Sequence, residues 1–254
     1  VVDDNPDMTD FLKRTFEGYF KRIIIAGDGG EALQLVRSHV PDIIVSDVMM
    51  PRMNGYKLCK TIKEDINISH IPVILLTARD DRQSQISGYK NGADGYLSKP
   101  FEVEMLMELI RNRLKNREYT KKRYLNAGLI PTPEESTISL TDETFLIKLN
   151  SIIQENIENS NLGIQFICQE VGLGRSSLYN KLKALTGMGA NEYISKLRIE
   201  KAITLISGTD MPFSEIAEKT GFTTPSYFST AFKQYTGETP SQYKERKKKG
   251  LADK

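Results

Sequence analysis

Five polar side chains in the first part of the chain could together handle a phosphoryl group. They are Asp3, Asp4, Asp47, Thr77 and Lys99, and each closely follows a short apolar run. Three carboxylates held close together repel each other unless a cation lies between them. Oxygen ligands without His or Cys favour Mg²⁺, which keeps several waters and pairs with phosphate oxygens. A lysine and a hydroxyl beside them supply the charge neutralisation and hydrogen bonding that a phosphoryl group needs.

The segments that must position these five residues alternate between strand patterns and helix patterns. Short apolar runs rich in β-branched residues occur at 23–25, 43–45, 73–76 and 95–97, and Val1-Val2 resembles the end of another strand. Amphipathic helical stripes occupy the gaps, for example Met8, Leu12 and Phe16. This alternation predicts an α/β fold, with a doubly wound, parallel, five-stranded sheet. Ligands of such sheets bind at the carboxyl ends of the strands, where the five polar residues are expected to meet.

The motifs around these residues resemble the receiver domain of two-component response regulators, a flavodoxin-like fold, over about residues 1–117. The matching segments are Val2-Asp3-Asp4-Asn5, Asp47-Val48-Met49-Met50-Pro51-x-Met53-x-Gly55, Thr77-Ala78 and Gly95-Tyr96-Leu97-x-Lys99-Pro100-Phe101. Such a domain is not an enzyme apart from catalysing its own phosphorylation and dephosphorylation.

The resemblance implies a role for each matching residue. Asp47 would be the phosphoacceptor, which attacks a phosphohistidine of a histidine kinase. Mg²⁺ would be held by Asp4, Asp47 and the Met49 carbonyl, with help from Asp3. Thr77 and Lys99 would contact the phosphoryl oxygens, and the Tyr96 rotamer would follow Thr77. A cis Lys99–Pro100 peptide bond is also implied.

Residues from 143 onward carry only helix signals and contain an internal repeat. Ile164, Ile167, Cys168, Val171 and Gly172 recur forty-nine positions later as Phe213, Ile216, Ala217, Thr220 and Gly221. A second stretch, which begins at Leu178, recurs fifty positions later from Phe228. Each copy therefore predicts two short helices joined by a glycine-containing turn, which is a helix-turn-helix unit.

The second helix of each copy presents polar residues opposite an apolar stripe. Leu178, Leu182 and Leu185 are expected to face inward in the first copy, and Phe228 and Phe232 in the second. The outward residues are Arg175, Ser176, Tyr179, Asn180 and Lys183 in the first copy, and Ser226, Ser229, Thr230 and Lys233 in the second. Short polar side chains suit base edges, whereas Lys and Arg suit phosphates. Two such helices could enter successive major-groove segments about 34 Å apart.

The pattern from Ile216-Ala217 through Gly221-Phe222 and Phe232-Lys233 to Tyr243 is similar to the AraC-type DNA-binding domain, over about residues 145–247. The resemblance implies base contacts by Ser176, Tyr179 and Asn180, and by Ser226, Ser229 and Thr230. Both faces contain little arginine, which leaves direct, shape and water-mediated readout open.

The predicted organisation is a receiver domain at 1–117, a linker at 118–142 and a DNA-binding domain with a basic tail at 143–254. The last receiver helix could run on through Tyr124, and Pro131–Thr137 is polar and proline-marked. Two distant cysteines, Cys59 and Cys168, are interpreted as buried reduced thiols. No apolar run is long enough to span a bilayer, so no membrane contact is expected of this segment.

These features favour a transcription regulator switched by phosphorylation of Asp47. The expected partners are double-stranded DNA, a histidine kinase and a second copy of the phosphorylated chain. The order of domains also resembles the C-terminal part of bacterial hybrid two-component proteins, so the kinase is either separate or in the same polypeptide. The chain is then cytoplasmic, or the cytoplasmic tail of a membrane-bound sensor, and the absence of an initial Met suggests residues upstream.

Two other classes of function remain open at this point. A phosphorelay or docking module would use the helical part to bind protein, which the duplicated recognition helices argue against. A metal-dependent phosphatase would fit the acidic cluster, but the chain has no signal of a substrate pocket.

Overall fold

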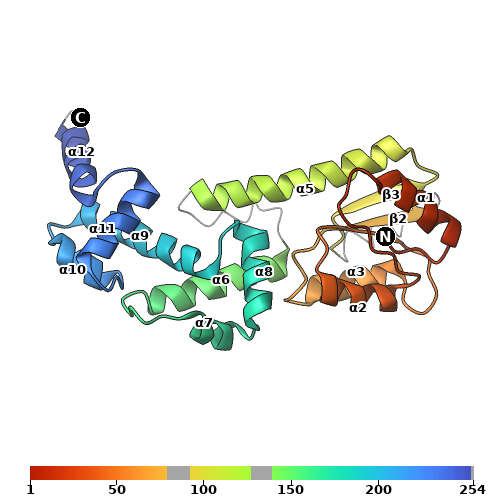
Figure 1. Cartoon of the computed structure of the whole chain (residues 1–254), viewed down its shortest axis with the longest axis horizontal. Helices are drawn as coiled ribbons and strands as arrows, with labels where there is room; N and C mark the ends of the chain where they lie inside the picture. Colours follow the sequence, from red (N-terminus) through yellow and green to blue (C-terminus); the bar gives the residue numbers. More distant parts are fainter. Residues whose placement is uncertain (79–91, 127–138, 253–254) are drawn as a thin grey trace. The chain divides into compact units, whose positions relative to one another are not determined.

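Residues 1–78, 92–126 and 139–252 are described in the structure, which is a computed structural model (Figure 1). They divide into two compact units, which are described separately below. The first unit contains the described residues 1–78, 92–123 and 139–144, and the second contains residues 124–126 and 145–252. Among the described residues, no helix combines the length and the apolar character that crossing a membrane would require.

The sheet of the first unit has three parallel strands in the order β1-β2-β3. They are β1 (Ile44–Asp47), β2 (Val73–Ala78) and β3 (Gly95–Lys99). Five strands were predicted, and the other two form no ladder. Val2 makes single-residue bridges to Ala26 and to Ser46.

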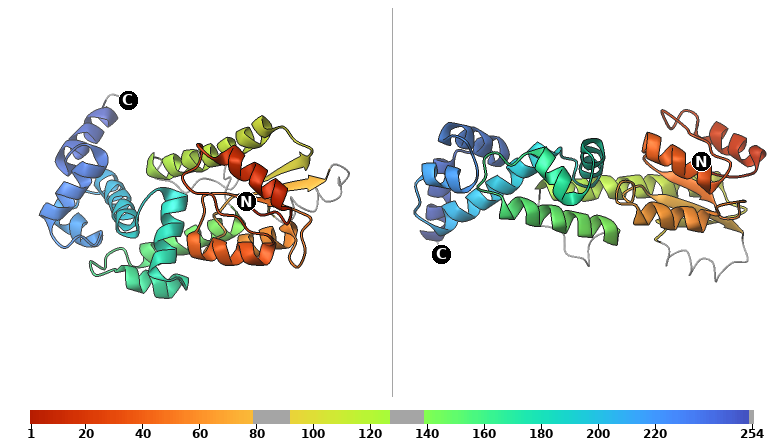
Figure 2. Two further views of the ribbon diagram at one scale, coloured as in Figure 1. Left: turned by 45° about the vertical axis from the view of Figure 1, so that its right-hand side comes forward. Right: turned by 90° about the horizontal axis from the view of Figure 1, so that it is seen from below.

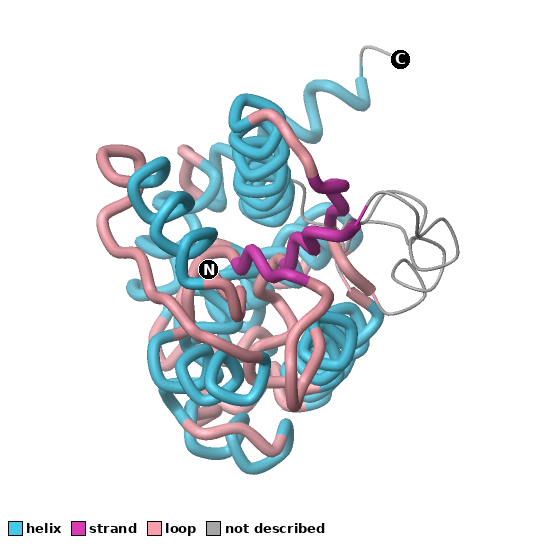
Figure 3. The backbone as a smooth tube through the Cα atoms, turned by 90° about the vertical axis from the view of Figure 1, so that its right-hand side faces the viewer, coloured by secondary structure: helices cyan, strands magenta, loops and turns pink. Residues whose placement is uncertain are grey.

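Helices cover both faces of the sheet, as the doubly wound prediction requires (Figures 1 and 3). On one face, α1 (Pro6–Phe16) and α5 (Val103–Asn126) pack on Val45, Ile74 and Leu76. On the other, α2 (Gly29–His39) and α3 (Gly55–Glu64) pack on Ile44, Val73 and Leu75. Successive strand residues point to opposite faces, so each strand contributes to both cores and reads as a continuous apolar run.

Local capping explains where two of these helices begin. The Asn5 side chain accepts a hydrogen bond from the Asp7 N–H at 2.9 Å, and Pro6 starts α1. The Asn54 side chain caps α3 in the same way by accepting from the Lys57 N–H at 2.9 Å. These contacts satisfy N–H groups that have no partner within the first turn of a helix.

The first unit ends beyond the region that resembles a receiver. Helix α5 runs on to Asn126, which agrees with a last helix that continues through Tyr124. The Ser69 hydroxyl donates to Asp142 Oδ1 at 2.7 Å, and both residues are buried. The Thr141 hydroxyl donates to the Lys63 carbonyl at 2.9 Å. The proline-marked part of the predicted linker, Pro131–Thr137, lies outside the described residues.

The second unit consists of helices, which Figure 2 presents in two further views. They are α6 (Leu140–Glu155), which begins in the first unit, α7 (Ile164–Val171), α8 (Arg175–Thr186), α9 (Ala190–Gly208), α10 (Phe213–Lys219), α11 (Pro225–Thr236) and α12 (Pro240–Ala252). The pairs α7–α8 and α10–α11 are the two predicted helix-turn-helix units, and α9 connects them. Thr224 caps α11 through the Tyr227 N–H at 3.1 Å, and Pro225 is its first residue.

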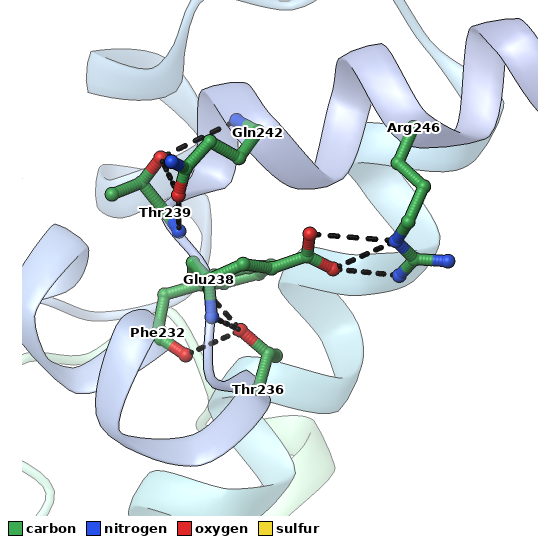
Figure 4. A network of polar contacts seen from close by, with 6 residues as sticks. All are labelled: Phe232, Thr236, Glu238, Thr239, Gln242 and Arg246. Atoms are coloured by element: carbon green, nitrogen blue, oxygen red, sulfur yellow. Dashed lines mark hydrogen bonds and ion pairs between the residues drawn. The ribbon is translucent and has the colours of Figure 1, made fainter.

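The turn between α11 and α12 is closed by a set of polar contacts (Figure 4). The Gln242 side chain accepts from the Thr239 N–H at 2.9 Å, and the Gln242 N–H donates to the Thr239 hydroxyl at 3.3 Å. Arg246 pairs with Glu238 at 2.6 Å. Lys244 of the same basic tail lies 3.2 Å from Asp210, so part of the charge of the tail is paired within the protein.

The interpretation of both cysteines as buried is correct for Cys59 and wrong for Cys168. Cys59 is fully buried in the core beneath α3, whereas Cys168 is only half-buried on α7. The difference follows from position, because α3 is covered by the sheet and α7 lies at the surface of a smaller helical unit. Burial raises the pKa of the Cys59 thiol to about 12.

We expect the two thiols to differ in reactivity towards iodoacetamide at about pH 8, because the thiolate is the reacting species. Mass spectrometry of the native protein should find Cys168 alkylated and Cys59 unmodified. In denaturant both should react. Modification of Cys59 in the folded protein would contradict the described core.

Candidate functional site

Parallel pairing brings the predicted polar residues to one edge of the sheet. Asp47 ends β1, where it is in register with Leu76 of β2. Thr77 of β2 pairs with Ser98, and the next pair joins Ala78 to Lys99. The Asp47 N–H donates to the Val2 carbonyl at 2.7 Å, which places the following residue, Asp3, beside Asp47.

Lys99 lies between two carboxylates at this edge. Its Nζ is 2.9 Å from Asp3 Oδ2 and 2.5 Å from Asp47 Oδ1. The side chains of Asp3 and Asp47 are 2% and 9% exposed, so both charges are largely removed from water. Burial by itself would lower the pKa of Lys99, but hydrogen bonds and charges from Asp47 and Asp3 outweigh it and raise that pKa. Lys99 is therefore held as a cation.

Backbone N–H groups hold the other carboxylate oxygens. The Met49 N–H donates to Asp47 Oδ2 at 2.5 Å, and the Asn5 N–H donates to Asp3 Oδ1 at 2.9 Å. Each carboxylate is thus fixed by one ion pair and one backbone donor. Such charge-assisted bonds orient the carboxylates before any ligand arrives.

The other predicted site residues lie around Asp3, Asp47 and Lys99 and differ in how deeply they are buried. Thr77 is buried, and its hydroxyl contacts the Ala78 carbonyl at 3.3 Å. Asp4 is exposed in the loop after Asp3, and the Met49 side chain is 74% exposed. Tyr96 is half-buried on β3 and packs against the core beneath α2 and α3. The predicted cis peptide bond between Lys99 and Pro100 is present.

The donor atoms at this edge are oxygens, which suits Mg²⁺ better than a soft metal ion. The described residues contain no group of three His, Cys, Asp or Glu side chains arranged to hold a metal. Asp3 and Asp47 supply two convergent carboxylates. A Mg²⁺ site here would have to be completed by backbone oxygen and water, which this ion accepts readily.

Sequence reasoning did not identify the contacts that shape the loop after Asp47. A Cβ on Gly55 would lie 2.2 Å from the Asp47 carbonyl oxygen, so only glycine allows α3 to start this close to β1. Arg52 adopts a left-handed conformation with φ +62°, and its Nε donates to Asp28 Oδ2 at 2.8 Å. Hydrogen bonding from Arg52 lowers the pKa of Asp28. Gly55 belongs to the motif quoted from the sequence, but its approach to the Asp47 backbone was not predicted, and nothing in the sequence indicated the Asp28 pairing.

The predicted DNA-reading residues lie at the surface of the second unit. Arg175, Ser176, Tyr179, Asn180 and Lys183 are exposed on α8, and Ser226, Thr230 and Lys233 are exposed on α11, with Ser229 half-buried. The inward stripes are buried as predicted, since Leu178 and Leu182 are each 1% exposed and Phe228 and Phe232 are 0% exposed. The second helix of each helix-turn-helix unit, α8 or α11, therefore presents its polar face to solvent.

Two features of these helices were not anticipated. Lys181 is fully buried on α8 and lies over the Phe145 ring at 5.1 Å, so it contributes to packing. Tyr227 on α11 is 53% exposed and is held edge-on by Phe222. An exposed aromatic side chain in the first turn of α11 adds apolar contact area beside Ser226.

Comparison with known proteins matches these two units separately. A model of the response regulator receiver domain matches residues 1–111, and a model of a helix-turn-helix domain matches residues 167–246. Over 246 residues the chain is 40% identical to histidine kinase P4 of Formosa agariphila. The aligned residues are 97% of this chain and 18% of that protein.

Two shorter relatives match about half of this chain. The DNA-binding response regulator MtrA of Mycolicibacterium smegmatis is 35% identical over 128 residues, which are 50% of this chain and 55% of that protein. The heme response regulator HssR of Staphylococcus saprophyticus is 40% identical over 115 residues, which are 45% of this chain and 50% of that protein. The chain thus spans at most about half the length of these relatives.

The sheet, the strand-end carboxylates and the lysine define the first unit as a receiver domain. Residues 1–111 belong to the receiver domain family, and the chain joins this receiver to a helix-turn-helix domain of AraC type at residues 167–246. Both resemblances found in the sequence are confirmed.

Gly55→Ala tests the close approach of α3 to the Asp47 backbone. The added methyl group would collide with a carbonyl oxygen that cannot rotate away, so we expect the receiver to lose on the order of 2 kcal/mol or more of stability. Urea unfolding followed by circular dichroism measures this loss. Gly208→Ala, where a Cβ meets nothing within 4 Å, is the matched control and should leave stability nearly unchanged. Equal stability of both variants would contradict the described loop.

Proposed function

We propose that this chain is a transcription regulator whose binding to duplex DNA is switched by Mg²⁺-dependent phosphorylation of Asp47. The observation that carries the proposal is the Lys99 ammonium held between Asp47 and Asp3 in a receiver that precedes two exposed recognition helices. An aspartate with one oxygen on a lysine and the other on a backbone N–H is oriented for nucleophilic attack.

Phosphoryl transfer would replace the bond from phosphorus to a histidine nitrogen with a bond to an oxygen of Asp47. A carboxylate oxygen of Asp47 forms a bond to phosphorus, and the bond from phosphorus to the histidine nitrogen of a kinase breaks. The nitrogen keeps the electron pair of that bond, and Asp47 becomes an acyl phosphate. Lys99 changes partners from the carboxylate to the new phosphoryl oxygens, while the Thr77 hydroxyl is available as a donor to them.

Asp3, Asp4, Asp47 and the Met49 carbonyl are the groups that would hold Mg²⁺. When bound, the ion neutralises charge on the phosphoryl oxygens during transfer. Dephosphorylation would use the same groups, with water as the attacking nucleophile. In this sense the domain catalyses its own phosphorylation and dephosphorylation without being an enzyme that acts on a separate substrate.

The switch would work through Thr77 and Tyr96. Thr77 is buried at the end of β2, and Tyr96 is half-buried on the adjacent strand. Movement of the Thr77 hydroxyl towards a phosphoryl group would open space that the Tyr96 ring could enter. This rearrangement would alter the surface around β3 and α5 and favour a homodimer, which raises DNA affinity through effective concentration.

The second unit would read DNA through α8 and α11. Ser176, Tyr179, Asn180, Ser226, Ser229 and Thr230 are the proposed base-contacting residues, and Arg175, Lys183 and Lys233 the proposed phosphate contacts. Hydroxyls of Ser229 and Thr230 donate to carbonyls one turn earlier, at 2.9 and 3.1 Å, which orients their oxygens as acceptors. Serine and threonine can contact either kind of base.

The kinase partner is a separate protein or a preceding part of the same polypeptide. Alignment of nearly the whole chain with a much longer protein named as a histidine kinase supports the second arrangement. We propose a cytoplasmic location in either case, because both phosphotransfer and access to DNA need it. Residues 1–117, 118–142 and 143–254 are the proposed receiver, linker and DNA-binding domain.

Phosphorylation is tested with acetyl phosphate and Mg²⁺, followed by intact mass spectrometry. We expect one added phosphoryl group on the wild-type chain, none on Asp47→Asn and none after chelation of Mg²⁺. Asp10→Asn, an exposed aspartate on α1, is the matched control and should be modified like the wild type. Modification of Asp47→Asn to the wild-type extent would contradict the assigned acceptor.

DNA binding is tested by the salt dependence of affinity for duplexes selected from a random pool by the wild-type chain. Each lysine that contacts a phosphate contributes about 1 to the log–log slope, so Lys183→Ala with Lys233→Ala should reduce the slope by about 2. Lys201→Ala, exposed on α9, should not change it. If the affinity of the wild-type chain for these duplexes did not change with salt concentration, a protein-docking function would be favoured.

A further inference from the structure

Arg198, in the middle of α9, contacts the turn before the first helix-turn-helix unit and the turn within the second. Its Nη2 donates to the Asn159 carbonyl at 2.7 Å, in the turn that leads from α6 into α7. On its other side the guanidinium carbon is 6.0 Å from the centre of the Phe222 ring, in the turn between α10 and α11. The residue is 8% exposed.

The two turns also approach each other directly. Gly221 has φ +70°, and a Cβ at this position would lie 2.2 Å from the Ile157 carbonyl oxygen and 2.8 Å from Arg198 Nη2. Glycine is therefore required both by the left-handed conformation and by the backbone of the other turn. Three segments that are distant in sequence, around 157–159, 198 and 221–222, meet at one place.

Other polar contacts of α9 join it to one side at a time. The Tyr193 hydroxyl donates to Asn150 Oδ1 at 2.8 Å on α6. The Tyr235 hydroxyl on α11 donates to Glu200 Oε1 at 3.3 Å. These contacts fasten each side to α9, but they do not join the two turns to each other. Arg198 adds a direct connection between the two turns.

Stability alone does not account for a buried arginine at this position. Burial lowers the pKa of Arg198, which is a sign that its charge is costly there. Its buried Nε has no hydrogen-bond partner in the described part of the chain. An apolar side chain could fill such a site at least as favourably. A charged, planar guanidinium can donate to a carbonyl while it lies over an aromatic ring.

We propose that Arg198 is a positioning residue that fixes the spacing of α8 and α11 and so restricts binding to duplexes with two major-groove segments at one separation. The effect on DNA rests on the proposed function, but the effect on spacing does not. A connecting helix with no further contact would let the two recognition helices adapt to different separations. The contact of Arg198 with both turns removes that freedom.

The spacing is measured by electron–electron double resonance between spin labels on Lys183→Cys in α8 and Lys233→Cys in α11, in the full chain with Cys168→Ser. Cys59 is buried and stays unlabelled. We expect one narrow distance distribution with Arg198 in place. Arg198→Gln should give a distribution about twofold wider, because units joined by one element sample collective hinge motions.

Controls separate positioning from folding. Lys201→Gln removes an exposed positive charge from the same helix and should leave the width unchanged. Arg198→Lys keeps the charge but not the planar face, and should widen the distribution partly. Phe222→Leu keeps an apolar residue and removes the ring, and should widen it as well. Wild-type width in folded Arg198→Gln and Phe222→Leu would overturn the proposal.

The DNA measurement uses duplexes selected from a random pool by the wild-type chain, with about 5 base pairs, half a helical turn, inserted between the two contacted segments. The insertion should weaken wild-type binding at least about tenfold, the size of a lost specific contact. Arg198→Gln should lose most of this difference. If the wild-type chain bound no duplex, the proposed function would fail, while the label distances would still decide the role of Arg198.

Discussion

The ion pair between Lys99 and the two carboxylates of Asp3 and Asp47 is the interaction on which the receiver site depends. Two like charges about 4 Å apart repel by about 4 kcal/mol at the effective dielectric near a protein surface, so buried carboxylates need a cation between them. The parallel sheet supplies that cation from a third strand end. The same carboxylates organise their own loops, because each accepts a backbone N–H two residues further along. Sheet register, loop shape and local charge therefore depend on one another.

Much of this arrangement could be predicted because it depends on local patterns. Apolar strand runs, helical stripes and caps such as Asn5-Pro6 are properties of short segments, and parallel pairing then brings strand ends together. The exposed faces of α8 and α11 followed from the apolar stripe opposite them. The repeat of forty-nine to fifty residues identified two equivalent units before any packing was known.

The rest depends on contacts between residues that are distant in sequence. Nothing near Asp142 indicates that it bonds Ser69, which lies 73 residues earlier. Arg52 and Asp28, or Arg198 and Asn159, are likewise paired only by the fold. Three of the five predicted strands form the ladder of the described sheet, and Val2 contributes only single-residue bridges to it. The burial of Lys181 was not predicted for a different reason. A long amphipathic side chain can be buried over an aromatic ring although its end is charged.

The receiver and the helical unit each contain a cation that contacts segments distant in sequence. In the receiver, the charge of Lys99 fixes the carboxylates of Asp3 and Asp47. In the helical unit, Arg198 and Gly221 lie where the turn before α7 meets the turn between α10 and α11. Both sites thus use a buried or half-buried cation to hold together segments that the sequence separates.

The most direct test of the central claim compares DNA binding of the wild-type chain and Asp47→Asn, each with and without acetyl phosphate and Mg²⁺, on one selected duplex. If phosphorylation of Asp47 controls DNA reading, the phosphodonor should raise wild-type affinity about tenfold or more through dimerisation and leave Asp47→Asn unchanged. Equal affinity in all four conditions would contradict the account.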